Sequence, residues 1–178
     1  MKVTLKWEEF NKIQDFAKAY AGKDNTRPVL TFINIKVKED RLVAEMVDGF
    51  KLARLEFVTQ ETNEETGFLL PITNKVKKQD VFVEIELSED GQEISLTTLK
   101  GKSIIKAGNG EFVNADRVWP QDEIKETVYF STKLLQEALK PFKNEMIRID
   151  YYGEFKPIII TDEITKDTGL VLPRRVTR

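Results

Sequence analysis

The chain has 178 residues, of which 40% are hydrophobic and 33% are charged, and its formal net charge is -2. This apolar content is enough for a folded core, and the length predicts one domain or slightly more. The near balance of charge excludes a strongly basic protein, so any face that binds nucleic acid must be local. The sequence has neither Cys nor His, which excludes disulfides, Cys/His zinc sites and His-based catalysis.

The N-terminal stretch MKVTLKWEEF carries charges from Lys2 onward and lacks the apolar segment of a signal peptide. No stretch of the chain approaches the ~18 consecutive apolar residues that a membrane-spanning helix needs. We therefore expect a soluble, cytoplasmic protein that does not enter a membrane.

The first 60 residues predict the order strand, helix, strand, strand, strand. The helix is expected at 8–20, where apolar residues recur at helical spacing: Phe10, Ile13, Phe16, Ala17 and Tyr20. Strands are expected at 1–7, 29–39, 41–48 and 50–59. Asp48-Gly49 lies between the last two strands, and this dipeptide is typical of a tight hairpin turn.

The same order returns at 66–110 and at 126–176. The second passage predicts strands at 66–72, 81–88, 93–101 and 102–108, with at most a short helix in TNKVKKQ (73–79). The third predicts a helix at 132–142 capped by Ser131 or Thr132, and strands at 126–131, 145–153, 156–163 and 168–176. The segment 111–125 connects these two passages. The pattern indicates three βαβββ repeats, although an ordinary α+β domain with antiparallel sheets would show it too.

The stretch TRPVLTFINIKVKEDRLVAEMVDGFKLARLEF (26–57) resembles the central domain of the bacterial sliding clamp family, the β subunit of the replicative DNA polymerase. The family signature Thr-Asp-Gly-x-Arg-Leu-Ala here reads Val47-Asp48-Gly49-Phe50-Lys51-Leu52-Ala53. An aromatic-Pro connector is matched by Trp119-Pro120, a strand ending in Pro by FLLP at 68–71, and a C-terminal Pro-x-Arg by Pro173-Arg174-Arg175. Lys51 in place of Arg, and Arg174 in place of an apolar residue, depart from the family pattern.

The resemblance implies an α+β protein with a DNA-clamp fold, built from βαβββ units with mainly antiparallel sheets and helices on one face. Residues 1–120 would form a complete clamp-like domain of two repeats, and 121–178 a half domain of one repeat. Rings of the family contain twelve such repeats. A ring of this chain would therefore be a tetramer.

The resemblance also implies an apolar groove that binds short peptides of DNA polymerases and other clamp-binding proteins. Such a peptide places one or two large side chains in a pocket and pairs its backbone with an edge. The residues implied for this groove are Leu30, Asp48, Gly49, Phe50, Lys51, Leu52, Trp119, Pro120, Val171, Leu172, Pro173, Arg174 and Arg175.

In clamps, the helices line the hole and contact the phosphates of double-stranded DNA without reading its bases. The resemblance implies this DNA-facing role for Lys75, Lys77 and Lys78 in the second repeat and Lys133, Lys140 and Lys143 in the third. The alternative interpretation is that these Lys-rich stretches are ordinary solvated helix faces.

The resemblance implies a non-catalytic processivity or tethering factor that encircles duplex DNA as a homo-oligomeric ring and recruits partners through the groove. No metal or cofactor is implied. The neighbouring carboxylates Asp162 and Glu163, and Glu45 and Asp48, do not define a catalytic pocket, and no phosphate-binding glycine motif occurs. Two other interpretations stay open. The chain could be a peptide-binding or decoy protein of a mobile element that does not encircle DNA, or a structural scaffold that binds neither DNA nor peptide.

Overall fold

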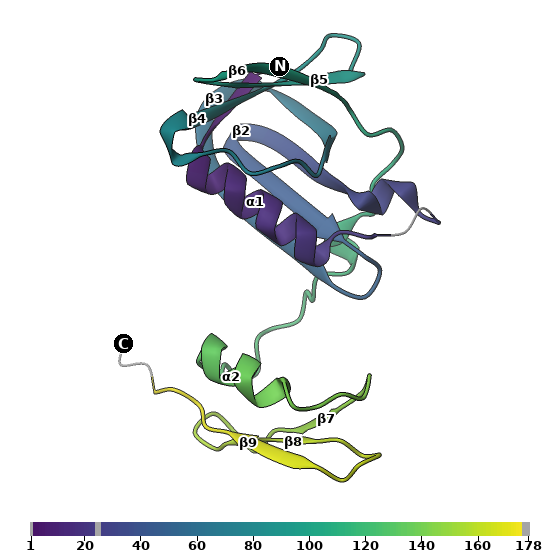
Figure 1. The fold of residues 1–178 in the computed structure, drawn as a ribbon, viewed down its shortest axis with the longest axis vertical. Coiled ribbons are helices and arrows are strands. Elements are labelled where there is room, and N and C mark those ends of the chain that lie inside the picture. Colours follow the sequence, from purple (N-terminus) through teal and green to yellow (C-terminus); the bar gives the residue numbers. More distant parts are fainter. Residues whose placement is uncertain (1, 24–25, 176–178) are drawn as a thin grey trace. The chain divides into compact units, whose positions relative to one another are not determined.

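The computed structural model describes residues 2–23 and 26–175, without the side chains of 60–64. The chain divides into two compact units, Met1–Trp119 (the N-terminal unit) and Pro120–Arg178 (the C-terminal unit). Both units combine one α-helix with antiparallel strands, as Figure 1 shows. The expected α+β fold class with mainly antiparallel sheets is therefore confirmed. Met1 and 176–178, which belong to the ranges predicted from the sequence, lie outside the described residues.

The N-terminal unit contains the residues of the first two predicted repeats. Its regular elements are β1 (Lys2–Lys6), α1 (Trp7–Tyr20), β2 (Phe32–Val47), β3 (Leu52–Pro71), β4 (Phe82–Leu87), β5 (Glu93–Thr98) and β6 (Gly101–Lys106). Three short 3-10 helices accompany them: η1 (Pro28–Thr31), η2 (Lys78–Asp80) and η3 (Ala115–Arg117). The C-terminal unit contains α2 (Thr132–Leu139), β7 (Arg148–Asp150), β8 (Ile158–Thr161) and β9 (Thr168–Val171).

The two repeats of the N-terminal unit exchange their leading segments, which are the residues that precede the helix or turn of each repeat. β1 is the leading segment of the first repeat, yet it pairs with β4 of the second, with Val3 opposite Ile85. Residues 66–71 in β3 lead the second repeat, yet they pair with 32–37 in β2 of the first. Each repeat therefore completes a sheet of the other.

The strands β2 and β3 are longer than the sequence predicts. The strands expected at 29–39 and 41–48 are continuous in β2, and those expected at 50–59 and 66–72 are continuous in β3. The pairing register shifts around Glu39, whose φ is +52°. Because neither Gly nor Pro interrupts this part of β2, the expected break becomes an irregularity within a ladder.

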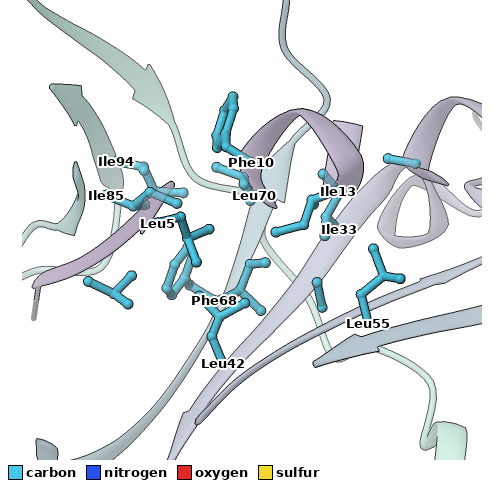
Figure 2. Packing of buried hydrophobic residues seen from close by; sticks show 14 of the residues in the cluster. Leu5, Phe10, Ile13, Ile33, Leu42, Leu55, Phe68, Leu70, Ile85 and Ile94 are labelled. Atoms are coloured by element: carbon cyan, nitrogen blue, oxygen red, sulfur yellow. The ribbon is translucent and has the colours of Figure 1, made fainter. Parts of the chain in front are cut away.

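The core of the N-terminal unit lies between α1 and the strands. Phe10 and Ile13 on the apolar stripe of α1 are fully buried, as are Ile33 of β2 and Leu70 of β3. Figure 2 shows these side chains gathered with residues of β1, β4 and β5. Burying a side chain of this size stabilises a fold by about 1.5–3 kcal/mol.

The short helix considered for 73–79 does not form. Only the 3-10 turn η2 is helical in this stretch, and it begins at Lys78. The backbone before it is bound by polar side chains of α1 instead: Gln14 accepts the N–H of Thr73 at 2.7 Å, and Asn11 bonds both the N–H and the carbonyl of Val76 at 2.9 Å. These bonds fix the non-helical backbone of this stretch against α1.

The C-terminal unit keeps the predicted helix but shorter strands. Ser131 caps α2, since its hydroxyl accepts the N–H of Leu134, and the helix ends at Leu139, before Pro141. α2 lies over the sheet β7-β8-β9 (Figure 1). The strand expected at 126–131 is not formed, because the described residues offer this segment no strand to pair with. The buried apolar residues of this unit are few: Ile158, Ile160 and Val171.

Candidate functional site

The loop 48–51, which joins β2 to β3, is fixed by one carboxylate. Asp48 Oδ1 accepts the backbone N–H of Phe50 and that of Lys51, both at 2.9 Å. Its other oxygen forms an ion pair with the Lys51 ammonium. Gly49 has φ of +98°, a conformation that residues with a Cβ adopt only with strain. Asp and Gly are therefore both needed for this loop geometry, and Phe50 at its tip is fully exposed.

The charges of the loop neutralise each other. The hydrogen bond from Lys51, followed by the backbone N–H of Phe50, lowers the pKa of Asp48 from its ordinary value of 3.8 to about 2. The Lys51 ammonium also lies 5.8 Å from the ring centroid of Tyr20, at the end of α1. Lys51 is thus held by Asp48 and Tyr20.

A surface hollow of about 620 Å³ lies beside this loop. It brings together five residues predicted for the peptide groove, namely Leu30, Asp48, Gly49, Phe50 and Lys51, with Ala21, Gly22, Lys23, Thr26 and Arg27. Leu30 is buried, and its carbonyl accepts the N–H of Gly22 at 2.8 Å. Sequence reasoning missed Lys23 and Arg27, which add positive charge to the lining. The hollow is more polar than the groove that the resemblance implies.

Two further predicted groove residues of the N-terminal unit, Leu52 and Trp119, are not among the residues that line the hollow. Leu52 begins β3 and is half-buried. Trp119 lies under the guanidinium of Arg54, which is 5.5 Å from its ring centroid. Arg54 also forms an ion pair with Asp116 of η3, and this contact holds the connector against the sheet.

A buried carboxylate supports the same region. Glu45 has no exposed surface, and it forms ion pairs with Arg54 at 2.6 Å and with Lys36 at 3.0 Å. Asn34 donates a third contact to it at 2.9 Å. A buried carboxylate with this many partners is satisfied where it stands, so its role is structural. The side chains that surround Glu45 come from β2 and β3, whose register the sequence does not show.

The remaining groove candidates belong to the C-terminal unit: Pro120, Val171, Leu172, Pro173, Arg174 and Arg175. Val171 is buried in the small core, whereas Leu172 is exposed. The N–H of Arg174 donates to the carbonyl of Tyr129 at 2.7 Å. Because these residues and the hollow lie in different compact units, the single groove stays a prediction.

The six lysines predicted to face DNA have unequal surroundings. Lys75 forms an ion pair with Asp15 of α1 at 2.7 Å, and Lys133 is 3.9 Å from Glu137 one turn along α2. Lys143 donates to the carbonyl of Lys140 at 3.0 Å. Lys77, which precedes η2, and Lys78, its first residue, are exposed. Contact of any of these lysines with DNA stays a prediction.

The carboxylates that could suggest catalysis are engaged elsewhere. Asp162 is buried, and it accepts hydrogen bonds from Asn144 and from the backbone of Ile164 and Thr165, which fixes the turn between β8 and β9. In the ranges 2–23 and 26–175, no group of three or more Asp and Glu residues is arranged to hold a metal ion. Nor does either α-helix there combine the length and apolar character needed to cross a membrane.

Comparison with known proteins identifies the class of this protein, a DNA clamp, and its family. The family model of the DNA polymerase III beta subunit, central domain, matches residues 4–114. The chain therefore belongs to the family of the DNA polymerase III beta subunit, the bacterial sliding clamp. A search of curated protein sequences gave no match.

Solved sliding clamps share the fold over nearly the whole chain. A Pseudomonas aeruginosa clamp with a ligand has a TM-score of 0.83 at 17% identity, and 98% of this chain covers 50% of it. The Streptococcus pneumoniae beta chain has a TM-score of 0.82 at 14% identity, with 99% and 50% covered. The Bacillus subtilis clamp has a TM-score of 0.75 at 15% identity, with 98% and 50% covered. This chain thus spans about half the length of these solved clamps.

Proposed function

We propose that this chain is a non-catalytic, sliding-clamp-like tethering factor. Homo-oligomeric rings of it would encircle duplex DNA without reading its sequence, as backbone contacts from Lys allow. The ring would recruit DNA polymerases or other partners through short peptides. Membership of the clamp family supports the clamp-like role.

The observation that carries the peptide-binding part is the fixed hairpin at Asp48–Lys51. Its backbone is locked by Asp48, so it offers a preorganised surface, and preorganisation lowers the entropic cost of binding. Phe50 is fully exposed at its tip next to the hollow. A large exposed aromatic residue beside a concave surface is typical of a protein-binding site.

Fluorescence anisotropy with a labelled clamp-binding peptide tests this proposal. We expect the full chain to bind with a Kd on the order of 1–10 μM, and Leu172→Asp to weaken binding at least about 10-fold because it places a charge at an apolar contact. Leu99→Asp is the matched control, since Leu99 is 78% exposed and Leu172 is 66% exposed. The peptide-binding proposal fails if the wild-type chain does not bind, or if Leu99→Asp causes the same loss.

The lysine surroundings favour a second candidate function. Lys75 is paired with Asp15 of α1, and Lys133 lies near Glu137 on its own helix α2. These carboxylates reduce the positive charge available to phosphates. A clamp-like protein that binds peptides without encircling DNA, such as a decoy, would fit this arrangement. A chain that binds the peptide but shows no binding to duplex DNA at low salt would belong to this second class.

A further inference from the structure

The second and third repeats share one backbone hydrogen bond, which joins the leading segment to the residues after the last strand. In the second, the carbonyl of Leu69 in the leading segment accepts the N–H of Gly108, two residues after β6, at 2.9 Å. In the third, the carbonyl of Tyr129 accepts the N–H of Arg174, three residues after β9, at 2.7 Å. The leading segment 126–131 is therefore in the same place relative to its own repeat as 66–71.

The other edge of this leading segment is open. In the N-terminal unit, residues 66–71 pair along that edge with 32–37 of β2, a strand of the other repeat. Residues 126–131 have no such partner anywhere in the described part of the chain. An unpaired edge of this kind exposes backbone N–H and carbonyl groups that can pair with another strand.

A second open edge lies on β7. In the N-terminal unit the equivalent strand, β4, is covered by β1 of the other repeat. β7 is the outer strand of the sheet β7-β8-β9 and pairs only with β8 among the described residues. The third repeat therefore leaves open both of the edges through which the first two repeats hold each other.

The exposure of Ile149 indicates that a further strand should cover the edge of β7. Ile149 lies opposite Ile160, which is fully buried, so the two side chains point to the same, core-facing side of the sheet. Ile149 is nevertheless 51% exposed. Its counterpart Ile85 lies opposite Leu96 on β5 and opposite Val3 on β1, and it is only 1% exposed. A core position with this much exposure lacks a covering strand.

We propose that the C-terminal unit pairs with the C-terminal unit of a second copy of this chain. Each copy contributes its segment 126–131 to the open edge of β7 in the other. The partner is a second copy because the two open edges are complementary to each other, and one two-fold axis satisfies both at once. The pairing reproduces the exchange of leading segments that already joins the two repeats of the N-terminal unit.

The register of this contact follows from the N-terminal unit. Leu5 precedes the start of α1 by two residues and lies opposite Val83, and Val3 lies opposite Ile85. Phe130 precedes the start of α2 by two residues, so it takes the place of Leu5. By this correspondence Val128 lies opposite Ile149, and Tyr129 lies opposite Arg148, of the second copy. The contact also enlarges a small apolar core, as oligomerisation does for other small units.

In the proposed function, this contact would be one of the interfaces between the subunits of the ring. That role rests on the proposed function. Two copies joined in this way contain three complete clamp-like domains of two repeats each. Two such dimers would supply the twelve repeats of a family ring. The contact itself is argued from strand edges and does not require DNA or peptide.

A disulfide cross-link in the full chain tests the register. The chain has no Cys, so Tyr129→Cys combined with Arg148→Cys introduces the only two thiols. Directly opposite residues in antiparallel strands have Cα atoms about 4.5–5.5 Å apart, within the range of a disulfide. We expect oxidised glutathione to convert most of this variant to a covalent dimer. Tyr129→Cys combined with Ile164→Cys is the control, because Ile164 lies in the turn after β8, and it should not cross-link.

Light scattering over a concentration series tests the same contact without a covalent bond. We expect Ile149→Lys to halve the mass and to weaken association at least about 100-fold, since it places an unpaired charge in the shared core. Ile164→Lys makes the same change at an exposed Ile and should keep the wild-type mass. A monomeric wild type, or an Ile149→Lys variant with unchanged mass, would overturn the proposal, as would equal cross-linking of both double variants. Loss of peptide or DNA binding alone would reject the proposed function and leave this dimer standing.

Discussion

Two carboxylates near the same hairpin have different roles because of their surroundings. Asp48 lies at the surface, where it shapes the loop through two backbone N–H groups and one ammonium. Glu45 lies three residues earlier and is fully buried among two cations and an amide. The first carboxylate fixes the backbone of a candidate binding loop. The second joins β2 to β3 beneath it.

The hairpin should lose stability in acid. The pKa of Asp48 is about 2 in the folded protein, below its ordinary value of 3.8. A lowered folded pKa stabilises the fold above the unfolded pKa, and this contribution is lost as the pH falls from about 4 to about 2. Asp48→Asn keeps the acceptor oxygen but not the charge, so its free energy of unfolding should fall less over this range.

Urea unfolding followed by circular dichroism at several pH values would measure this difference. Asp122→Asn, at an exposed residue of the connector, should follow the wild type over the same range. Equal pH dependence of Asp48→Asn and wild type would contradict the assigned role of the Asp48 charge.

Removing the buried carboxylate should cost much more than removing an exposed partner of the same Arg. Glu45→Ala leaves Lys36 and Arg54 without their buried partner, and we expect the free energy of unfolding to fall by about 3 kcal/mol. Asp116→Ala removes the exposed partner of Arg54 and should have a much smaller effect. Chemical denaturation of both variants gives the comparison. Similar losses would mean that Glu45 is not the main support.

At the scale of elements, the strand exchange depends on a close approach after β6. The N–H of Gly108 bonds to the carbonyl of Leu69. A Cβ at Gly108 would lie 2.6 Å from Leu69 Cβ and 2.7 Å from Phe32 Cδ1. These distances are shorter than real side chains tolerate, so only Gly fits between β2, β3 and the end of β6.

Gly108→Ala should therefore destabilise the N-terminal unit by about 1–3 kcal/mol, the range for overpacking a core. Gly67→Ala is the control, because its nearest neighbour would be the carbonyl oxygen of Ile35 at 3.5 Å, an ordinary contact. That variant should be close to neutral or slightly stabilising. Thermal unfolding of the two variants checks this, and the same Tm for both would contradict the close approach.

At the scale of the whole molecule, the two units differ in how completely their cores are formed. The core of the N-terminal unit includes residues from α1 and from five strands, all well buried. The core of the C-terminal unit has three buried apolar residues, and no residue of α2 is buried. A unit of this kind has little stability of its own. Assembly with a second copy would supply the additional buried apolar surface that the C-terminal unit lacks in the single chain.

DNA binding by an assembled ring should depend steeply on salt. Each lysine that contacts a phosphate contributes about -0.9 to the slope of log K against log salt on duplex DNA. We therefore expect Lys77→Ala combined with Lys78→Ala to reduce the magnitude of that slope by about 2. Lys125→Ala combined with Lys156→Ala removes two exposed lysines of the C-terminal unit and should leave the slope unchanged. Equal slopes for both variants would remove Lys77 and Lys78 from the DNA-facing set.

Local patterns predicted most of the elements but not all of their limits. The apolar stripe at Phe10 and Ile13 predicted α1, and Ser131 before a helical pattern predicted the start of α2. The local sequence could not show that 73–79 is not helical. The backbone there is bound by side chains of α1, which is distant in sequence. The leading segment 126–131 is rich in residues that favour strands, but this composition does not provide a partner strand.

The candidate site was predictable to a similar degree. The dipeptide Asp48-Gly49 predicts the tight loop, because the backbone geometry of the loop requires those two residues. Lys23 and Arg27 beside the loop were missed, since they reach it from the segment after α1. No local pattern reports which distant side chains line a hollow.

The sequence by itself predicted the order of helices and strands, the hairpin at Asp48-Gly49 and the family resemblance. These are properties of short stretches, in which periodicity and turn chemistry act over a few residues. Only the tertiary structure decided which strands pair across repeats, where Glu45 finds its partners, and why Ile149 is exposed at a core-facing position. Those features depend on contacts between residues far apart in the chain. Such contacts stabilise the protein only after folding has brought the strands together.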